Sequence, residues 1–102
     1  MVAISLDNQR IAQLCAEWKI SELSLFGSVL REDFNSKSDI DVLVTYDRDA
    51  DWGLFDHQRL EQELSALFGR RVDLVSRRGL ERSRNQLRRQ AILQSAESIY
   101  VS

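Results

Sequence analysis

The sequence predicts an α/β (α+β) fold, in which helices flank a small mixed β-sheet in a single domain of residues 1–102. Three observations lead to this fold class. Helical spacing of apolar residues alternates along the chain with short runs of β-branched residues. The length of 102 residues leaves room for one core only. The apolar fraction of 43% and the charged fraction of 29% are ordinary for a folded globular protein.

The first element is a helix at residues 7–18. Asp7 is a suitable N-cap, and the residues after it repeat an apolar stripe at helical spacing. Cys15 lies on this stripe, so we interpret it as a buried, inert thiol rather than a nucleophile. The stripe consists of Ile11, Leu14, Cys15 and Trp18.

The next segment predicts two strands joined by a short helical turn. Residues 23–26 are apolar and precede Gly27, which suits a buried strand that ends in a tight turn. A brief helix follows at residues 28–31. Residues 40–46 are rich in β-branched and aromatic side chains, and we interpret them as the central strand.

The second half of the chain predicts two more helices and two more strands. A helix is expected at residues 54–68, with Gly69 as its C-terminal stop. A strand at 71–75, a last helix at 80–95 and a short edge strand at 98–101 complete the sheet. The inward residues of the helix at 54–68 are expected to be Leu60, Leu64, Leu67 and Phe68. Those of the last helix are expected to be Leu87, Ala91 and Ile92.

Charge is unevenly distributed, although the net charge is only −2. Residues 32–63 contain ten acidic and three basic residues, whereas residues 70–89 contain eight arginines and two acids. One surface region therefore suits cations and another suits phosphates or an acidic partner, unless the arginines simply form a solvated helix face. Because basic charge does not cover the whole domain, direct nucleic-acid binding is not expected.

The cysteine count and the hydropathy exclude several classes of protein. A single cysteine forms no internal disulfide and no multi-cysteine zinc site. No apolar run approaches the ~20 residues that a membrane helix needs, and the first ten residues lack the features of a secretory signal. We expect a cytoplasmic protein without membrane association.

Two carboxylates on the central strand are the first sign of chemistry. Because side chains alternate along a strand, Asp39 and Asp41 project from one face while Ile40 and Val42 project from the other. Neighbouring carboxylates repel each other unless a cation lies between them or they share a proton. Such hard oxygen ligands suit Mg²⁺, which takes its remaining ligands from water and substrate phosphates.

A Gly-Ser pair and a third acid extend this pattern. Gly27 permits a close approach of the backbone to a ligand, and Ser28 adds a donor for a phosphate oxygen. Asp73 lies between the apolar residues Val72 and Leu74 in the next predicted strand. Burial of an acid there is costly without a partner, and a metal shared with the other two acids would supply one. Asp73 is also a candidate acceptor for a hydroxyl proton.

These residues resemble the minimal nucleotidyltransferase (MNT) domain of the DNA polymerase β superfamily. The signature is Gly-Ser, ten residues, Asp-x-Asp, and later a third acid on a strand, and it falls here on Gly27, Ser28, Asp39, Asp41 and Asp73. More narrowly, the chain resembles the MNT antitoxins encoded beside HEPN-domain toxins. The resemblance implies a polymerase-β-like nucleotidyltransferase fold.

The resemblance also implies an activity. ATP would be the nucleotide donor, and Asp39, Asp41 and Asp73 would hold two Mg²⁺ ions. The acceptor would be a tyrosine of a HEPN ribonuclease toxin, whose activity adenylylation blocks, in a hetero-oligomer with that toxin. Many members carry an arginine and a glycine three and four places after the serine; Arg31 is present here and is a candidate phosphate ligand, but Glu32 replaces the glycine.

Other interpretations remain open at this point. The same fold could neutralise a toxin by stoichiometric binding without catalysis, or adenylylate a small molecule. His57 is expected to be a surface residue. Trp52 and Phe55 are either ordinary core residues or an apolar contact for a partner.

Overall fold

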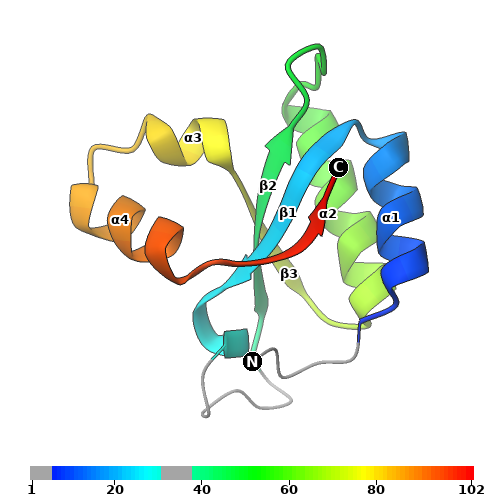
Figure 1. Cartoon of the computed structure of the whole chain (residues 1–102), viewed down its shortest axis with the longest axis horizontal. Helices are drawn as coiled ribbons and strands as arrows, with labels where there is room; N and C mark the ends of the chain where they lie inside the picture. Colours follow the sequence, from blue (N-terminus) through cyan, green and yellow to red (C-terminus); the bar gives the residue numbers. More distant parts are fainter. Residues whose placement is uncertain (1–5, 31–37) are drawn as a thin grey trace.

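The computed structural model describes residues 6–30 and 38–102 and contains a four-stranded mixed sheet. The strand order is β3-β2-β1-β4 (Figure 1). β1 pairs antiparallel with both β2 and β4, whereas β2 and β3 are parallel. The strands are β1 (Ile20–Phe26), β2 (Ile40–Tyr46), β3 (Val72–Ser76) and β4 (Glu97–Val101). The predicted mixed sheet and the predicted edge strand at the end of the chain are confirmed.

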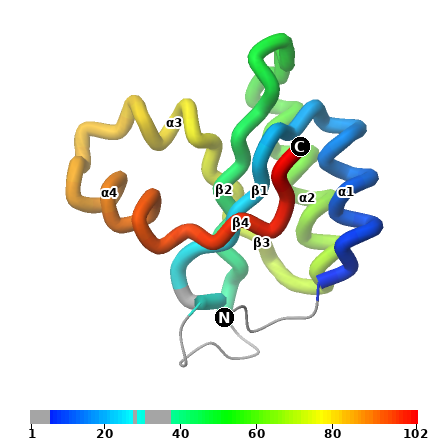
Figure 2. The backbone as a smooth tube through the Cα atoms, in the orientation of Figure 1, coloured from blue at the N-terminus to red at the C-terminus, as the bar shows by residue number. Residues whose placement is uncertain are grey.

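Helices cover both faces of this sheet. Two of them, α1 (Asn8–Glu17) and α2 (Leu54–Phe68), pack on one face and enclose the main core. A short 3-10 helix, η1 (Gly27–Leu30), follows β1. The last two, α3 (Arg77–Glu81) and α4 (Gln86–Ser95), lie on the other side of the sheet, as Figures 1 and 2 show.

The main core forms because strand residues alternate between the faces. Ile40, Val42 and Val44 of β2 are fully buried against α1 and α2. Leu60 and Leu64 of α2 are also fully buried, as their spacing predicts. A smaller cluster on the opposite face joins the sheet to α3 and α4, and it consists of Phe26, Leu43, Leu80 and Ile92. The two clusters fix which face of β2 carries its polar side chains.

Local signals set the helix ends where the sequence predicts them. The Asp7 side chain accepts a hydrogen bond from the Arg10 backbone N–H at 3.2 Å and caps α1. Gly69 ends α2 in the left-handed conformation, with φ of 68°. Cys15 is fully buried in the core, and this burial raises the pKa of its thiol to about 12. The predicted burial of this thiol is therefore confirmed.

The prediction of one continuous last helix at residues 80–95 is wrong. The chain forms α3 and α4 instead, and the side chain of Asn85 caps the start of α4 by accepting from the Arg88 backbone N–H. A capping side chain at this position favours a new helix over continuation of the old one. Ile92 is buried as expected, but Leu87 is 81% exposed.

Two strand boundaries also differ from the prediction. β1 begins at Ile20, directly after Lys19, which adopts a positive φ of 52°. β3 covers Val72–Ser76 rather than residues 71–75. Along the described parts of the chain, none of the helices has the length and apolar character to cross a membrane.

Candidate active site

Two of the predicted acids lie side by side on the sheet. Asp41 of β2 pairs in register with Asp73 of the parallel strand β3. Their chain neighbours on β2 and β3 are buried in the main core, so both carboxylates belong to the opposite face. These neighbours are Ile40, Val42, Val72 and Leu74.

Asp39 lies just before β2, in a segment that the residues before β3 hold in place. The Ile40 backbone N–H donates to the Arg71 carbonyl at 3.0 Å, and the Arg70 guanidinium donates to the Ser38 carbonyl at 3.4 Å. Asp39 lies between these contacts and is exposed. Strand alternation places it on the same side as Asp41.

We call the carboxylates of Asp39, Asp41 and Asp73 the acid row. Gly27 brings the end of β1 against this row. Phe26 pairs with Asp41 across the antiparallel strands, and Gly27 follows with a φ of 75°. A Cβ atom at Gly27 would collide with the Asp41 carboxylate. Any larger residue there would be strained and would displace the carboxylate, so the site depends on glycine.

The remaining predicted phosphate ligands are only partly placed. The backbone of Ser28 lies in η1, which is the brief helix expected after Gly27. The side chain of Ser28 and the whole of Arg31 lie outside the described residues.

Asp73 is exposed, which corrects one expectation from the sequence. Because water reaches it, the position of Asp73 carries no burial penalty that a metal would have to offset.

Within residues 6–30 and 38–102, no cluster of three or more His, Cys, Asp and Glu side chains forms a complete metal site. The oxygen-only donors Asp39, Asp41 and Asp73, with the close backbone at Gly27, nevertheless match the ligand chemistry of Mg²⁺, which keeps several waters.

Three side chains of α2 hold the edge strand that carries Asp73, and sequence reasoning missed this role. Ser65 Oγ accepts from the Val72 N–H at 3.0 Å, and Glu61 Oε2 accepts from the Leu74 N–H at 2.9 Å. His57 Nε2 donates to the Leu74 carbonyl at 3.0 Å. His57 is thus a partly buried structural residue, not a surface residue. The sequence signal for this role is the spacing of His57, Glu61 and Ser65, which recur every four residues and so form a polar stripe on one face of α2.

Comparisons with known proteins agree with this geometry. The family model for the nucleotidyltransferase domain matches residues 9–99. The protein adenylyltransferase MntA of Thermococcus cleftensis is 35% identical over 69 residues, which are 68% of each chain. A candidate protein adenylyltransferase of Methanocaldococcus jannaschii is 41% identical over 59 residues. This second alignment spans 58% of the relative's length.

Solved structures show the same fold. A candidate minimal nucleotidyltransferase superposes with a TM-score of 0.68 at 36% identity, over 88% of this chain and 86% of the other. A toxin–antitoxin complex crystallised with AMP-PNP contains a chain with a TM-score of 0.71 at 23% identity. That match covers 95% of this chain and 75% of the other, and it supports the fold alone. The family match over most of the sequence, together with the acid row and the adjoining glycine, shows that the chain belongs to the nucleotidyltransferase domain family.

Proposed function

We propose that this protein is a Mg²⁺-dependent nucleotidyltransferase that transfers AMP from ATP to a hydroxyl group of a partner protein. The acceptor is a tyrosine of a HEPN-domain ribonuclease toxin, and the modification neutralises the toxin. Residues 1–102 act as one minimal nucleotidyltransferase domain in a hetero-oligomer with that toxin. Family membership and relatives named protein adenylyltransferase support the reaction class.

The observation that carries the proposal is the in-register pair of Asp41 and Asp73 beside the backbone of Gly27. Carboxylates on adjacent strands supply ligands from two directions to one small site. Because Gly27 has no side chain, the Asp41 carboxylate lies directly against the backbone that would bind the phosphate chain. Asp39 supplies a third carboxylate from the same end of β2.

Each residue has a defined part in the proposed reaction. Gly27 and Ser28 bind the β- and γ-phosphates, and Arg31 contacts the same phosphates. Asp39 and Asp41 would hold both metal ions, and Asp73 would complete the ligands on the acceptor side. Bound Mg²⁺ would lower the pKa of the attacking hydroxyl and stabilise negative charge on the phosphates.

The transfer itself is a displacement at phosphorus. The acceptor oxygen forms a bond to the α-phosphorus, the bond from that phosphorus to the bridging oxygen breaks, and pyrophosphate leaves. The Asp73 carboxylate takes the proton of the acceptor hydroxyl. Its exposed position lets an acceptor from another protein approach this side of the row.

The solved complexes support a toxin as the partner. One similar structure contains a tri-AMPylated HEPN toxin of Shewanella oneidensis with its MNT antitoxin, and the matched chain has a TM-score of 0.63 at 22% identity. The fold likeness and the AMP-modified toxin in that complex together suggest the class of acceptor. The AMP-PNP complex suggests ATP as the donor in the same way.

A labelling experiment tests the proposal. The purified chain is incubated with the co-expressed partner, Mg²⁺ and ATP labelled at the α-phosphate, and the label is expected on a tyrosine of the partner. The double variant Asp39→Asn with Asp41→Asn should abolish labelling. A matched variant, Asp49→Asn with Asp51→Asn, removes the same charge from an exposed loop and should label normally.

Three results would contradict the proposal. Unchanged labelling by the Asp39 and Asp41 variant would mean that these acids do not hold the reacting nucleotide. Full neutralisation of the toxin by that variant at equal dose would favour stoichiometric binding without catalysis. Labelling of a small molecule in the absence of any partner would assign a different acceptor.

A further inference from the structure

A cleft of about 600 Å³ lies at the carboxyl ends of β2 and β3, away from the acid row. Its size falls within the range of small-ligand sites. Asp41 is four residues from Thr45, which lines the cleft, so the two lie about 13 Å apart along β2. The cleft and the acids therefore occupy opposite ends of the same parallel strands.

The topology favours a binding site at this position. β2, α2 and β3 form a parallel crossover unit. In open α/β sheets, ligands bind in the crevice beyond the carboxyl ends of the parallel strands. The lining residues come from the end of β2, the loop before α2, the first turn of α2 and the start of α3.

Three aromatic rings line the cleft, and we call them the aromatic wall; a hydrogen bond holds the polar edge of each. Tyr46 Oη lies 3.3 Å from His57 Nδ1, and His57 Nε2 donates to the Leu74 carbonyl. Nδ1 is therefore the acceptor, and the Tyr46 hydroxyl donates to it. Trp52 Nε1 donates to the Trp18 carbonyl at 2.7 Å. Because these bonds fix the rings, their surfaces are preorganised for stacking.

The Tyr46 hydroxyl also keeps the aromatic wall uncharged. Burial, and secondarily the Asp56 carboxylate, raise the pKa of Tyr46 to about 12. The phenol is neutral at physiological pH and remains a hydrogen-bond donor to His57. Tyr46 therefore contributes apolar ring surface to the cleft without adding a negative charge of its own.

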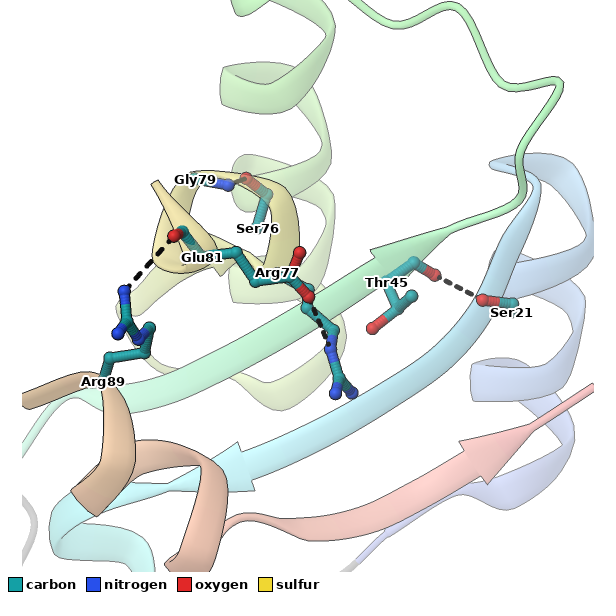
Figure 3. Close-up of polar contacts among 7 residues, drawn as sticks. All are labelled: Ser21, Thr45, Ser76, Arg77, Gly79, Glu81 and Arg89. Carbon is teal, nitrogen blue, oxygen red and sulfur yellow. Dashed lines mark hydrogen bonds and ion pairs between the residues drawn. The ribbon is translucent and has the colours of Figure 1, made fainter. Parts of the chain in front are cut away.

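A second set of lining side chains, which we call the arginine wall, carries cationic and hydroxyl groups, together with the Glu81 carboxylate that pairs with Arg77. Arg77 donates through Nε to Glu81 Oε1 at 3.2 Å, and its two Nη groups make no further hydrogen bond or ion pair with the described residues. Arg78 is exposed and has no ion pair among those residues. Ser76 Oγ accepts from the Gly79 N–H, so its own proton is available to a ligand. Figure 3 shows Ser76 and Arg77 at the turn from β3 into α3, with Thr45 on the neighbouring strand.

We propose that this cleft binds a free purine nucleoside 5′-monophosphate at a site separate from the acid row. The base stacks on the rings of Tyr46, Trp52 and His57. Arg77 and Arg78 bind the phosphate through charge-assisted hydrogen bonds, and a cleft lined by both aromatic rings and an arginine pair matches both parts of this ligand. The inference does not depend on the transfer reaction.

Binding of AMP to the full chain in Mg²⁺-free buffer tests the inference. Titration calorimetry should show one site, and the fluorescence of the tryptophans should change because Trp52 lines the cleft. Arg78→Ala should raise the Kd about tenfold, which corresponds to one lost charge-assisted hydrogen bond. Inorganic phosphate should bind more weakly than AMP, because it contacts only the arginine wall.

Two matched variants separate this site from its alternatives. Arg84→Ala removes an exposed arginine that does not line the cleft and should leave the Kd unchanged. Asp41→Asn alters the acid row and should also leave AMP binding unchanged. No binding of AMP, equal binding of AMP and phosphate, or equal weakening by Arg84→Ala would overturn the inference. A loss of AMP binding in Asp41→Asn would assign the nucleotide to the acid row instead.

Discussion

Asp41 and Asp73 face each other in register across the parallel strands β2 and β3. Like charges directly opposite each other on a sheet destabilise the pairing. The main core nevertheless fixes this register, because a shift by one residue would place apolar side chains in water. The repulsion is thus built into the folded state, and a cation would relieve it.

The first prediction concerns this acid pair and Mg²⁺. For wild-type protein, Mg²⁺ at ten times its Kd should stabilise the fold by about 1.4 kcal/mol and raise the Tm by roughly 6–11 °C. Asp73→Asn should not lower the Tm without Mg²⁺, because Asp73 is exposed, but it should remove most of the Mg²⁺ effect. Thermal unfolding with and without MgCl₂ measures both. An Asp73→Asn protein with the full Mg²⁺ shift would refute the shared site.

The second prediction compares two glycines that share a left-handed backbone. Gly27→Ala and Gly69→Ala should each lose roughly 1–2 kcal/mol through backbone strain. Only Gly27→Ala should also abolish adenylyl transfer, because its Cβ meets the Asp41 carboxylate while that of Gly69 meets open space. Urea unfolding and the labelling assay distinguish the two effects. Normal transfer by Gly27→Ala would show that the close approach at Gly27 is dispensable.

The third prediction concerns the support of β3 by α2. Glu61→Ala leaves the Leu74 N–H without its acceptor and should cost about 1–3 kcal/mol of stability. Gln62→Ala, at the next and exposed position of the same helix, should change stability by less than about 0.5 kcal/mol. Urea denaturation measures both values. Equal stability of the two variants would show that Glu61 does not support the strand.

The fourth prediction follows from the buried thiol. Burial raises the pKa of Cys15 from 9.0 to about 12. Above about pH 9 the unfolded chain therefore loses a proton that the folded chain keeps, and the free energy of unfolding falls as the pH rises through this window. Urea midpoints at about pH 8 and pH 10 should fall more for wild type than for Cys15→Ala. Parallel decreases would exclude a contribution from this thiol.

The sequence alone predicts most of the secondary structure. Asp7, Gly69 and the alternation in β2 are local signals, and local signals are read directly from residue order. They fail where a capping side chain competes with helix continuation, as Asn85 does between α3 and α4. The acid pattern and the Gly-Ser pair are also visible in the sequence. Their roles as ligands stay predictions until the proposed experiments are done.

What the sequence by itself determined is the set of chemical groups and the face of each strand on which they lie, because periodicity depends only on neighbours in the chain. Only the tertiary structure decided that Asp41 pairs with Asp73 and that Gly27 lies against Asp41. It also decided that His57 supports β3 and that the aromatic and arginine walls form one cleft. These contacts join residues far apart in the chain, and the packing of the whole core, rather than any local pattern, brings them together.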